Sequence, residues 1–148
     1  MGLRKNGILF LETHIMIKIK ILDDRIKPEE IGYKTEGAAA IDIYALPTEN
    51  GYFQGYSTGI AVEIPDGYVG IIVPRSSTGI KGYTLKNTLG IIDSDYRGEI
   101  KLHFFTPIME KMRVAQMLIM PCPQFDIEFV EELGETKRGT GGFGSTGN

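Results

Sequence analysis

The sequence predicts an all-β fold, a barrel or sandwich of roughly eight or more short strands. Three observations lead to this class. Several short stretches alternate apolar and polar residues with a period of two, Gly- and Pro-containing turns separate them, and no segment of ten or more residues has helical periodicity. The chain is therefore expected to bury its core between sheets rather than between helices.

The length of 148 residues suits one domain with a single core. Residues 1–14 are expected to be an N-terminal appendage, because the strand pattern starts only at Ile15 and Met16 could serve as an alternative start. The apolar run 8–11 is too short for a signal peptide or a membrane span. We expect residues 15–135 to form the barrel core and residues 136–148 to form a flexible C-terminal arm.

The expected strands share alternation or a nearly continuous apolar run. They lie at residues 15–22, 58–64, 68–73, 100–105, 112–120 and 125–129. The second and third of these are separated by Pro65, Asp66 and Gly67, which predicts a β-hairpin. The stretch 112–120 is apolar apart from Arg113 and Gln116, as is typical of a strand covered on both faces.

The segment from Gly90 to Ile100 is predicted to be a second β-hairpin, with the other elements arranged around it. Its turn carries a carboxylate, an aromatic ring and a guanidinium close together, at Asp93, Tyr96 and Arg97. Asp93 follows directly on a strand, where a carboxylate serves either as a turn former or as a catalytic base.

Two further stretches place polar groups where they could meet an anion. After the strand end at Pro74, the run 75–79 offers Arg75, three hydroxyls and free backbone N–H groups at a turn or short helix start. This is either an anion cradle or an ordinary helix cap. Asp42 lies within the apolar run 38–43, where a charge needs partners.

The C-terminal segment is rich in glycine. Residues 139–144 formally match the GxGxxG pattern, but only four residues follow Gly144, so no helix can open there. The segment is either a disordered end or an arm that folds over a phosphorylated ligand.

Composition excludes several classes of protein. The net charge of −3 argues against general nucleic-acid binding, which requires a basic excess. A single cysteine, Cys122, cannot form an internal disulfide, which fits a reducing cytoplasm. His14 and His103 are not spaced as zinc ligands. We therefore expect a cytoplasmic protein without a membrane or nucleic-acid partner.

Five stretches, in order, resemble the motifs of the trimeric deoxyuridine triphosphatases (dUTPases), which hydrolyse dUTP to dUMP and pyrophosphate. They lie at residues 39–43, 74–77, 90–98, 113–118 and 138–147. The resemblance implies a distorted jelly-roll-like β-barrel and a homotrimer whose C-terminal arms are exchanged between subunits. It also implies Mg²⁺ as cofactor, and a cellular role in limiting uracil incorporation into DNA and supplying dUMP for thymidylate synthesis.

The same resemblance implies roles for individual residues. Asp93 resembles the base that orients the attacking water, and Gln116 the residue near the α-phosphate and that water. Asp42 resembles an outer-sphere residue around Mg²⁺, which the phosphates and waters mainly hold. The residues that resemble substrate contacts are Arg75, Ser76 and Ser77 for phosphate, Asn87 and Lys101 for uracil, Tyr96 for deoxyribose, and Arg138, Phe143, Gly144, Ser145 and Thr146 for the closing arm.

Some positions depart from the family pattern. Ala40 stands where Gly is usual, and residues 110–112 stand where Gly and an acidic residue are common. Two alternatives stay open: a relative of the dCTP deaminases, which share the barrel, and a non-catalytic nucleotide-sensing or protein-binding module on the same barrel.

Overall fold

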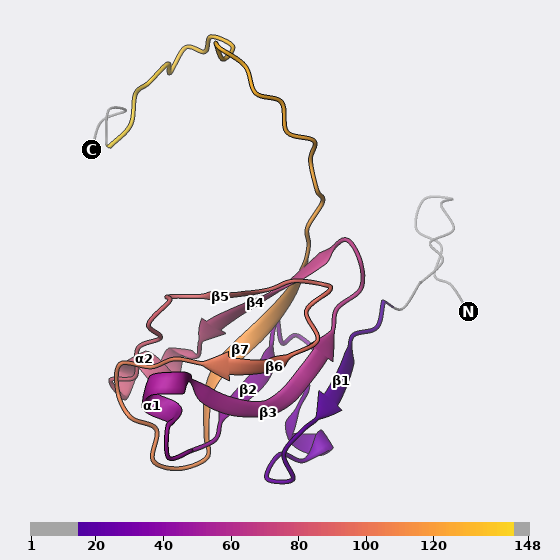
Figure 1. The fold of residues 1–148 in the computed structure, drawn as a ribbon, viewed down its shortest axis with the longest axis vertical. Coiled ribbons are helices and arrows are strands. Elements are labelled where there is room, and N and C mark those ends of the chain that lie inside the picture. The colour runs from indigo at the N-terminus through magenta and orange to yellow at the C-terminus, as the bar shows by residue number, and fades with distance from the viewer. Residues whose placement is uncertain (1–14, 144–148) are drawn as a thin grey trace.

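The fold is built from two antiparallel sheets that face each other (Figure 1). The structure is a computed structural model and describes residues 15–143, which contain seven strands. The first sheet has three strands in the order β1, β3, β6, with bounds Lys18–Ile21, Tyr56–Glu63 and Glu99–Leu102. The second has four strands in the order β2, β7, β4, β5, with bounds Ile41–Ala45, Met112–Pro121, Tyr68–Pro74 and Gly90–Ile92.

Helices are short in this part of the chain. They are the 3₁₀ turn η1 (Pro28–Glu30), α1 (Gly51–Gln54) and α2 (Ser76–Ile80). The all-β class and the short helix start after Pro74 are thereby confirmed. No helix within residues 15–143 is long and apolar enough to cross a membrane.

The core lies between the two sheets, where the alternating strands direct their apolar side chains inward. β7 pairs with β2 on one side and with β4 on the other. The predicted burial of β7 on both faces is wrong, because only Val114, Ala115 and Met117 are buried and both ends of the strand carry exposed residues. The largest fully buried apolar side chains are Tyr56, Phe104, Ile26, Ile43, Leu46, Ile60, Ile64, Ile72, Ile100, Met117 and Val114.

The two predicted hairpins are wrong in their pairing. β3 and β4 follow each other in sequence but belong to different sheets, and the turn 65–67 takes the chain from one sheet to the other. Similarly, β5 pairs with β4, whereas β6 pairs with β3. Alternation shows which side of a strand is buried but does not show which strand lies beside it.

The chain beyond β7 leaves the body as a long extended segment (Figure 1). The strand predicted at residues 125–129 does not form within this chain, and Phe125 and Phe129 are 82% and 96% exposed. An alternating segment becomes a strand only where an edge is available for pairing, and within residues 15–143 this segment meets none.

Candidate active site

The turn that joins β5 to β6, residues 93–98, is held by its own hydrogen bonds. The Tyr96 N–H donates to the Asp93 carbonyl at 3.2 Å. The Arg97 guanidinium donates to the Ser94 carbonyl at 2.6 Å and to the Tyr96 carbonyl at 3.1 Å. These bonds close the turn locally, so Asp93 and Tyr96 have fixed places relative to each other.

Asp93 and Tyr96 line one hollow of about 610 Å³. The Tyr96 ring lies against Gly98, where an added Cβ would collide with the phenol, so residue 98 must be glycine for the ring to take this position. The Tyr96 hydroxyl donates to the Glu99 carbonyl at 3.0 Å, and 44% of the residue stays exposed. The remaining lining residues are Ile91, Ile92, Glu99, Ile100 and Lys101.

Asn87 is exposed in the loop before β5 and is not among the residues that line this hollow. Its amide nitrogen lies 3.8 Å from the place where a Cβ on Gly90 would stand, so it borders the start of β5. Thr88, the next residue, has φ of +58°, which is strained for a β-branched side chain. This strained turn brings the chain back into the β4–β5 ladder.

The predicted phosphate-binding residues lie at the start of α2. The Thr78 hydroxyl donates to the Val114 carbonyl at 2.6 Å and so anchors α2 to β7. Arg75 and Ser77 line a second hollow of about 270 Å³ together with Arg113, whereas Ser76 is exposed and lines neither hollow. Guanidinium, hydroxyl and backbone N–H groups are thus gathered at one place, as anion binding requires.

Asp42 is buried between two arginines. Its carboxylate lies 2.9 Å from Arg75 Nε and 3.1 Å from Arg113 Nη1, and only 7% of the residue is exposed. Gln116 stands opposite Asp42 in the β2–β7 ladder and donates its side-chain amide to the Pro74 carbonyl at 3.3 Å. The partners that a charge in this apolar run requires are therefore Arg75 and Arg113.

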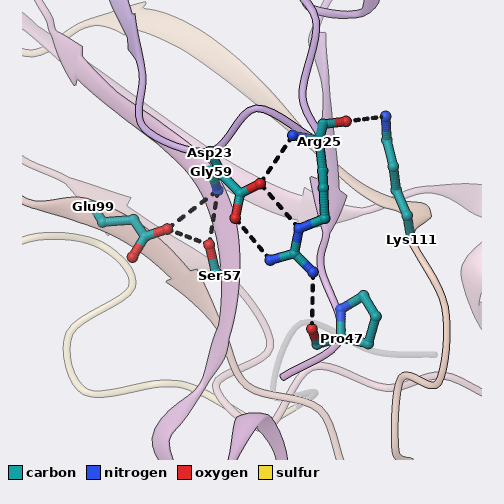
Figure 2. Close-up of polar contacts among 7 residues, drawn as sticks. All are labelled: Asp23, Arg25, Pro47, Ser57, Gly59, Glu99 and Lys111. Carbon is teal, nitrogen blue, oxygen red and sulfur yellow. Dashed lines mark hydrogen bonds and ion pairs between the residues drawn. The ribbon is translucent and has the colours of Figure 1, made fainter. Parts of the chain in front are cut away.

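Lys111 also borders the second hollow, but its ammonium is already engaged. It donates to the Glu30 carboxylate at 2.6 Å. It also donates to the Arg25 carbonyl at 2.6 Å (Figure 2). The hydrogen bond from Lys111 holds the pKa of Glu30 below its usual value. Lys111 is therefore engaged within the protein, whereas Lys81, which also lines this hollow, has no ion pair among the described residues.

The site residues predicted from sequence form two separate groups in one chain. Asp93, Tyr96 and Lys101 line the first hollow, Arg75 and Ser77 line the second, and the two linings share no residue.

Residues of the predicted arm lie apart from both hollows. Arg138 donates to the Gly141 carbonyl at 2.7 Å, and Phe143 is fully exposed. Gly144, Ser145, Thr146 and the N-terminal appendage 1–14 lie outside the described residues.

Two contributors were missed by sequence reasoning. Arg113 opens the fourth family motif and stands out as a polar residue in an apolar strand, but the sequence assigned it no role, and Glu99 in the predicted hairpin was likewise given none. The unexplained arginine in β7 was a usable signal, but its partner is 71 residues away and cannot be read from local pattern.

Comparison with known proteins assigns the chain to a family. The family model described as dUTPase matches residues 28–147. The chain belongs to the dUTPase family. The prediction from the five motifs is thereby confirmed.

Relatives and solved structures agree with this assignment. The deoxyuridine 5'-triphosphate nucleotidohydrolases of Francisella tularensis subsp. novicida strain U112 and subsp. holarctica strain LVS are each 41% identical over 145 residues, covering 88% of this chain and 98% of the relative. A mutant dUTPase of Staphylococcus bacteriophage 80alpha with dUpNHpp superposes with a TM-score of 0.71 at 22% identity, covering 90% of this chain and 99% of that one. The latter likeness supports the jelly-roll-like fold.

Proposed function

We propose that this protein hydrolyses dUTP to dUMP and pyrophosphate. The observation that supports the proposal is the turn 93–98, because Asp93 and the partly exposed Tyr96 both line one hollow. A carboxylate beside an aromatic surface is what water activation next to a bound nucleoside requires. Membership of the dUTPase family supports dUTP as the substrate.

Asp93 acts in this proposal as the general base. Water is a poor nucleophile, and a carboxylate placed beside it accepts its proton as it attacks phosphorus. Gln116 assists by orienting the water or the α-phosphate. In the free chain its amide is bound only to a backbone carbonyl at 3.3 Å, so this interaction can be exchanged at low cost.

Tyr96 and its neighbours select the nucleoside. A ring packed under the sugar leaves no space for a 2′-hydroxyl, which favours deoxyribose over ribose. Uracil is recognised by hydrogen bonds from backbone groups near Lys101 and from the side chain of Asn87. These donors and acceptors are arranged as in a base pair. The strained Thr88 conformation fixes the backbone on the side of Asn87.

Arg75, Ser76 and Ser77 bind the phosphates, with Arg113 beside them. Asp42 neutralises one of the two positive charges and holds the Arg75 guanidinium by its Nε atom. Of the other nitrogens of that guanidinium, Nη1 donates to the Arg113 carbonyl at 3.4 Å, and Nη2 is not used by the ion pair and can donate to phosphate oxygens.

We further propose that the working form is a homotrimer with exchanged C-terminal arms. The two hollows of one chain share no lining residue. This favours a site in which the nucleoside-binding residues of one subunit lie next to the phosphate-binding residues of another. The exposed apolar side chains of residues 125–133 favour packing of this extension on a neighbouring subunit. Arg138, Phe143, Gly144, Ser145 and Thr146 would then close over the bound triphosphate.

Members of the dUTPase family generally depend on a divalent metal ion, and we propose Mg²⁺ here. Within residues 15–143 no cluster of three or more His, Cys, Asp or Glu side chains is arranged to hold a metal. A metal carried by the triphosphate oxygens fits this donor set, and it would neutralise charge on the phosphates. Asp42, already bonded to two arginines, is left an outer-sphere role at most.

In the cell, the proposed reaction limits uracil incorporation into DNA and supplies dUMP for thymidylate synthesis, in the cytoplasm. We propose that the whole chain acts as one domain, with residues 15–135 as core and 136–148 as arm.

The function is tested by incubating the protein with dUTP, dCTP, dTTP and UTP in the presence of Mg²⁺. Pyrophosphate release from dUTP alone is the expected result. Ammonia release from dCTP would instead indicate a deaminase, and nucleotide binding without turnover would indicate a sensing module.

A further inference from the structure

The β3–β6 ladder is interrupted beside the proposed nucleoside hollow. Ser57 pairs with Lys101 and Ala61 pairs with Glu99, so β3 advances from residue 57 to residue 61 while β6 advances only from 99 to 101. The extra length on β3 forms a bulge. Gly59 in this bulge has φ of +69°, a conformation that favours glycine.

The Glu99 side chain compensates for the interruption (Figure 2). One carboxylate oxygen accepts from the Gly59 N–H at 3.2 Å and from the Ser57 hydroxyl in a short hydrogen bond. On the other side of the bulge, the Gly59 carbonyl accepts from the Leu22 N–H at 2.7 Å. The Gly59 N–H also donates to the Ser57 hydroxyl oxygen at 3.0 Å. Both backbone groups of Gly59 are therefore paired, and Glu99 is bound to a fixed point of the first sheet.

The backbone of Glu99 also holds Tyr96. Its carbonyl accepts the Tyr96 hydroxyl at 3.0 Å. The buried Thr58 hydroxyl donates to the Ile100 carbonyl at 2.7 Å and fixes the next residue of β6. A continuous set of contacts thus runs from the bulge of β3 through Glu99 to the phenol of Tyr96.

We infer that Glu99 is a positioning residue that sets the Tyr96 ring against the sugar and thereby governs discrimination between dUTP and UTP. This inference rests on the proposed function. The bonded carboxylate oxygen faces β3 rather than the substrate, so Glu99 acts through Tyr96. Asp93 follows β5, which pairs with β4 in the second sheet, whereas Tyr96 is held by β6, which pairs with β3 in the first sheet. Weakening the contacts between β6 and β3 should therefore displace Tyr96 relative to Asp93.

The test compares kcat/KM for dUTP and for UTP in Glu99→Ala and Glu99→Gln. Glu99→Ala should reduce the preference for dUTP by about tenfold, the effect of losing one hydrogen bond to a charged group. Glu99→Gln keeps an oxygen that can accept from Ser57 and Gly59, so it should retain most of the preference. Glu29→Gln is the matched control, because Glu29 is exposed in η1 and does not line this hollow.

Two further measurements keep the inference falsifiable. If Glu99→Ala does not fold, Ser57→Ala removes the hydroxyl donor without removing the carboxylate and should also lower the preference for dUTP. Hydrogen exchange of the peptide covering residues 93–98 in the free protein should be faster in Glu99→Ala than in Glu29→Gln.

The outcomes separate this inference from the proposed function. A Glu99→Ala or Ser57→Ala protein with the wild-type dUTP/UTP preference overturns the inference, even if its melting temperature falls. A wild-type protein that does not hydrolyse dUTP refutes the proposed function. In that case unchanged hydrogen exchange at residues 93–98 would overturn the positioning role of Glu99 as well.

Discussion

Replacing Asp42 by Asn tests the ion pairs that join Arg75 and Arg113 in the proposed phosphate-binding site. Asp42 is 7% exposed and lies 2.9 Å from Arg75 Nε and 3.1 Å from Arg113 Nη1. Asn has nearly the same shape but only one acceptor oxygen and no charge. The variant therefore keeps one hydrogen bond, loses the other, and leaves two guanidiniums close together without a counter-ion.

The expected loss of stability follows from the exposure of the partners. Breaking a fully buried ion pair costs about 3–5 kcal/mol, and one hydrogen bond to a charged group contributes about 1.5–3 kcal/mol. The side chains of Arg75 and Arg113 are 27% and 38% exposed, so water partly replaces the lost partner. We expect a decrease of about 2–3 kcal/mol in the free energy of unfolding, or about 4–10 °C in melting temperature for a chain of this size.

The assay is thermal unfolding followed by far-UV circular dichroism in EDTA. Protein concentration must be fixed, because the apparent stability of an oligomer depends on it. Asp66→Asn, in the exposed turn between β3 and β4, is the matched control and should melt like the wild type. A change below about 1 °C in Asp42→Asn, given the expected size of the effect, would refute the structural role of this network. A shifted Mg²⁺ requirement with unchanged melting would favour the outer-sphere role instead.

Four further predictions concern catalysis and acid stability. Asp93→Asn should still bind dUTP but lose about 10² to 10⁴ in kcat; full activity would remove Asp93 from the mechanism. Tyr96→Ala should raise kcat/KM for UTP relative to dUTP, and an unchanged ratio would contradict the steric role of the ring. A chain ending at Glu135 should remain folded with an unchanged melting temperature but lose most dUTP hydrolysis; retained hydrolysis would contradict the closing arm. Hydrogen bonds from Arg25 lower the pKa of Asp23 to about 2. This partly exposed pair should therefore contribute about 1 kcal/mol to the free energy of unfolding above pH 4, and the contribution should be lost as the pH falls toward 2. Urea titrations of wild type and Asp23→Asn across this pH range measure the difference.

The positions of β3 and β4 could be predicted because their signals are local, whereas β2 was not among the expected strands and the strand expected at residues 125–129 does not form. Period-two alternation and Gly- or Pro-containing turns located the strands at 58–64 and 68–73 to within about two residues, the usual error at strand boundaries. Their pairing could not be predicted in this way. The turn 65–67 is compatible with a hairpin and equally with a connection that crosses from one sheet to the other. Which of the two forms depends on how the apolar faces of both sheets pack together, and this cannot be read from the turn residues.

The same distinction applies to the site. Asp93 and Tyr96 are three residues apart in one turn, so their proximity follows from local geometry. Asp42, Arg75 and Arg113 lie on separate elements, and their contact depends on the order of strands in the second sheet. The family motifs identified Asp42 and Arg75 as site residues. They did not indicate that the charges of Asp42 and the two arginines neutralise one another.

The turn 93–98 derives its rigidity from its place between the sheets. A hairpin turn is fixed only by the ladder beneath it, whereas here β5 is bonded to β4 and β6 is bonded to β3. Movement of Tyr96 relative to Asp93 is therefore opposed both by the core between the sheets, where Ile72 and Ile100 are buried, and by the contacts of Glu99 with β3. A polar loop with its own short hydrogen bonds thus gains the precision that a catalytic base and a sugar-contacting ring require. The hydrophobic core acts on the proposed chemistry through this connection, without contacting the substrate.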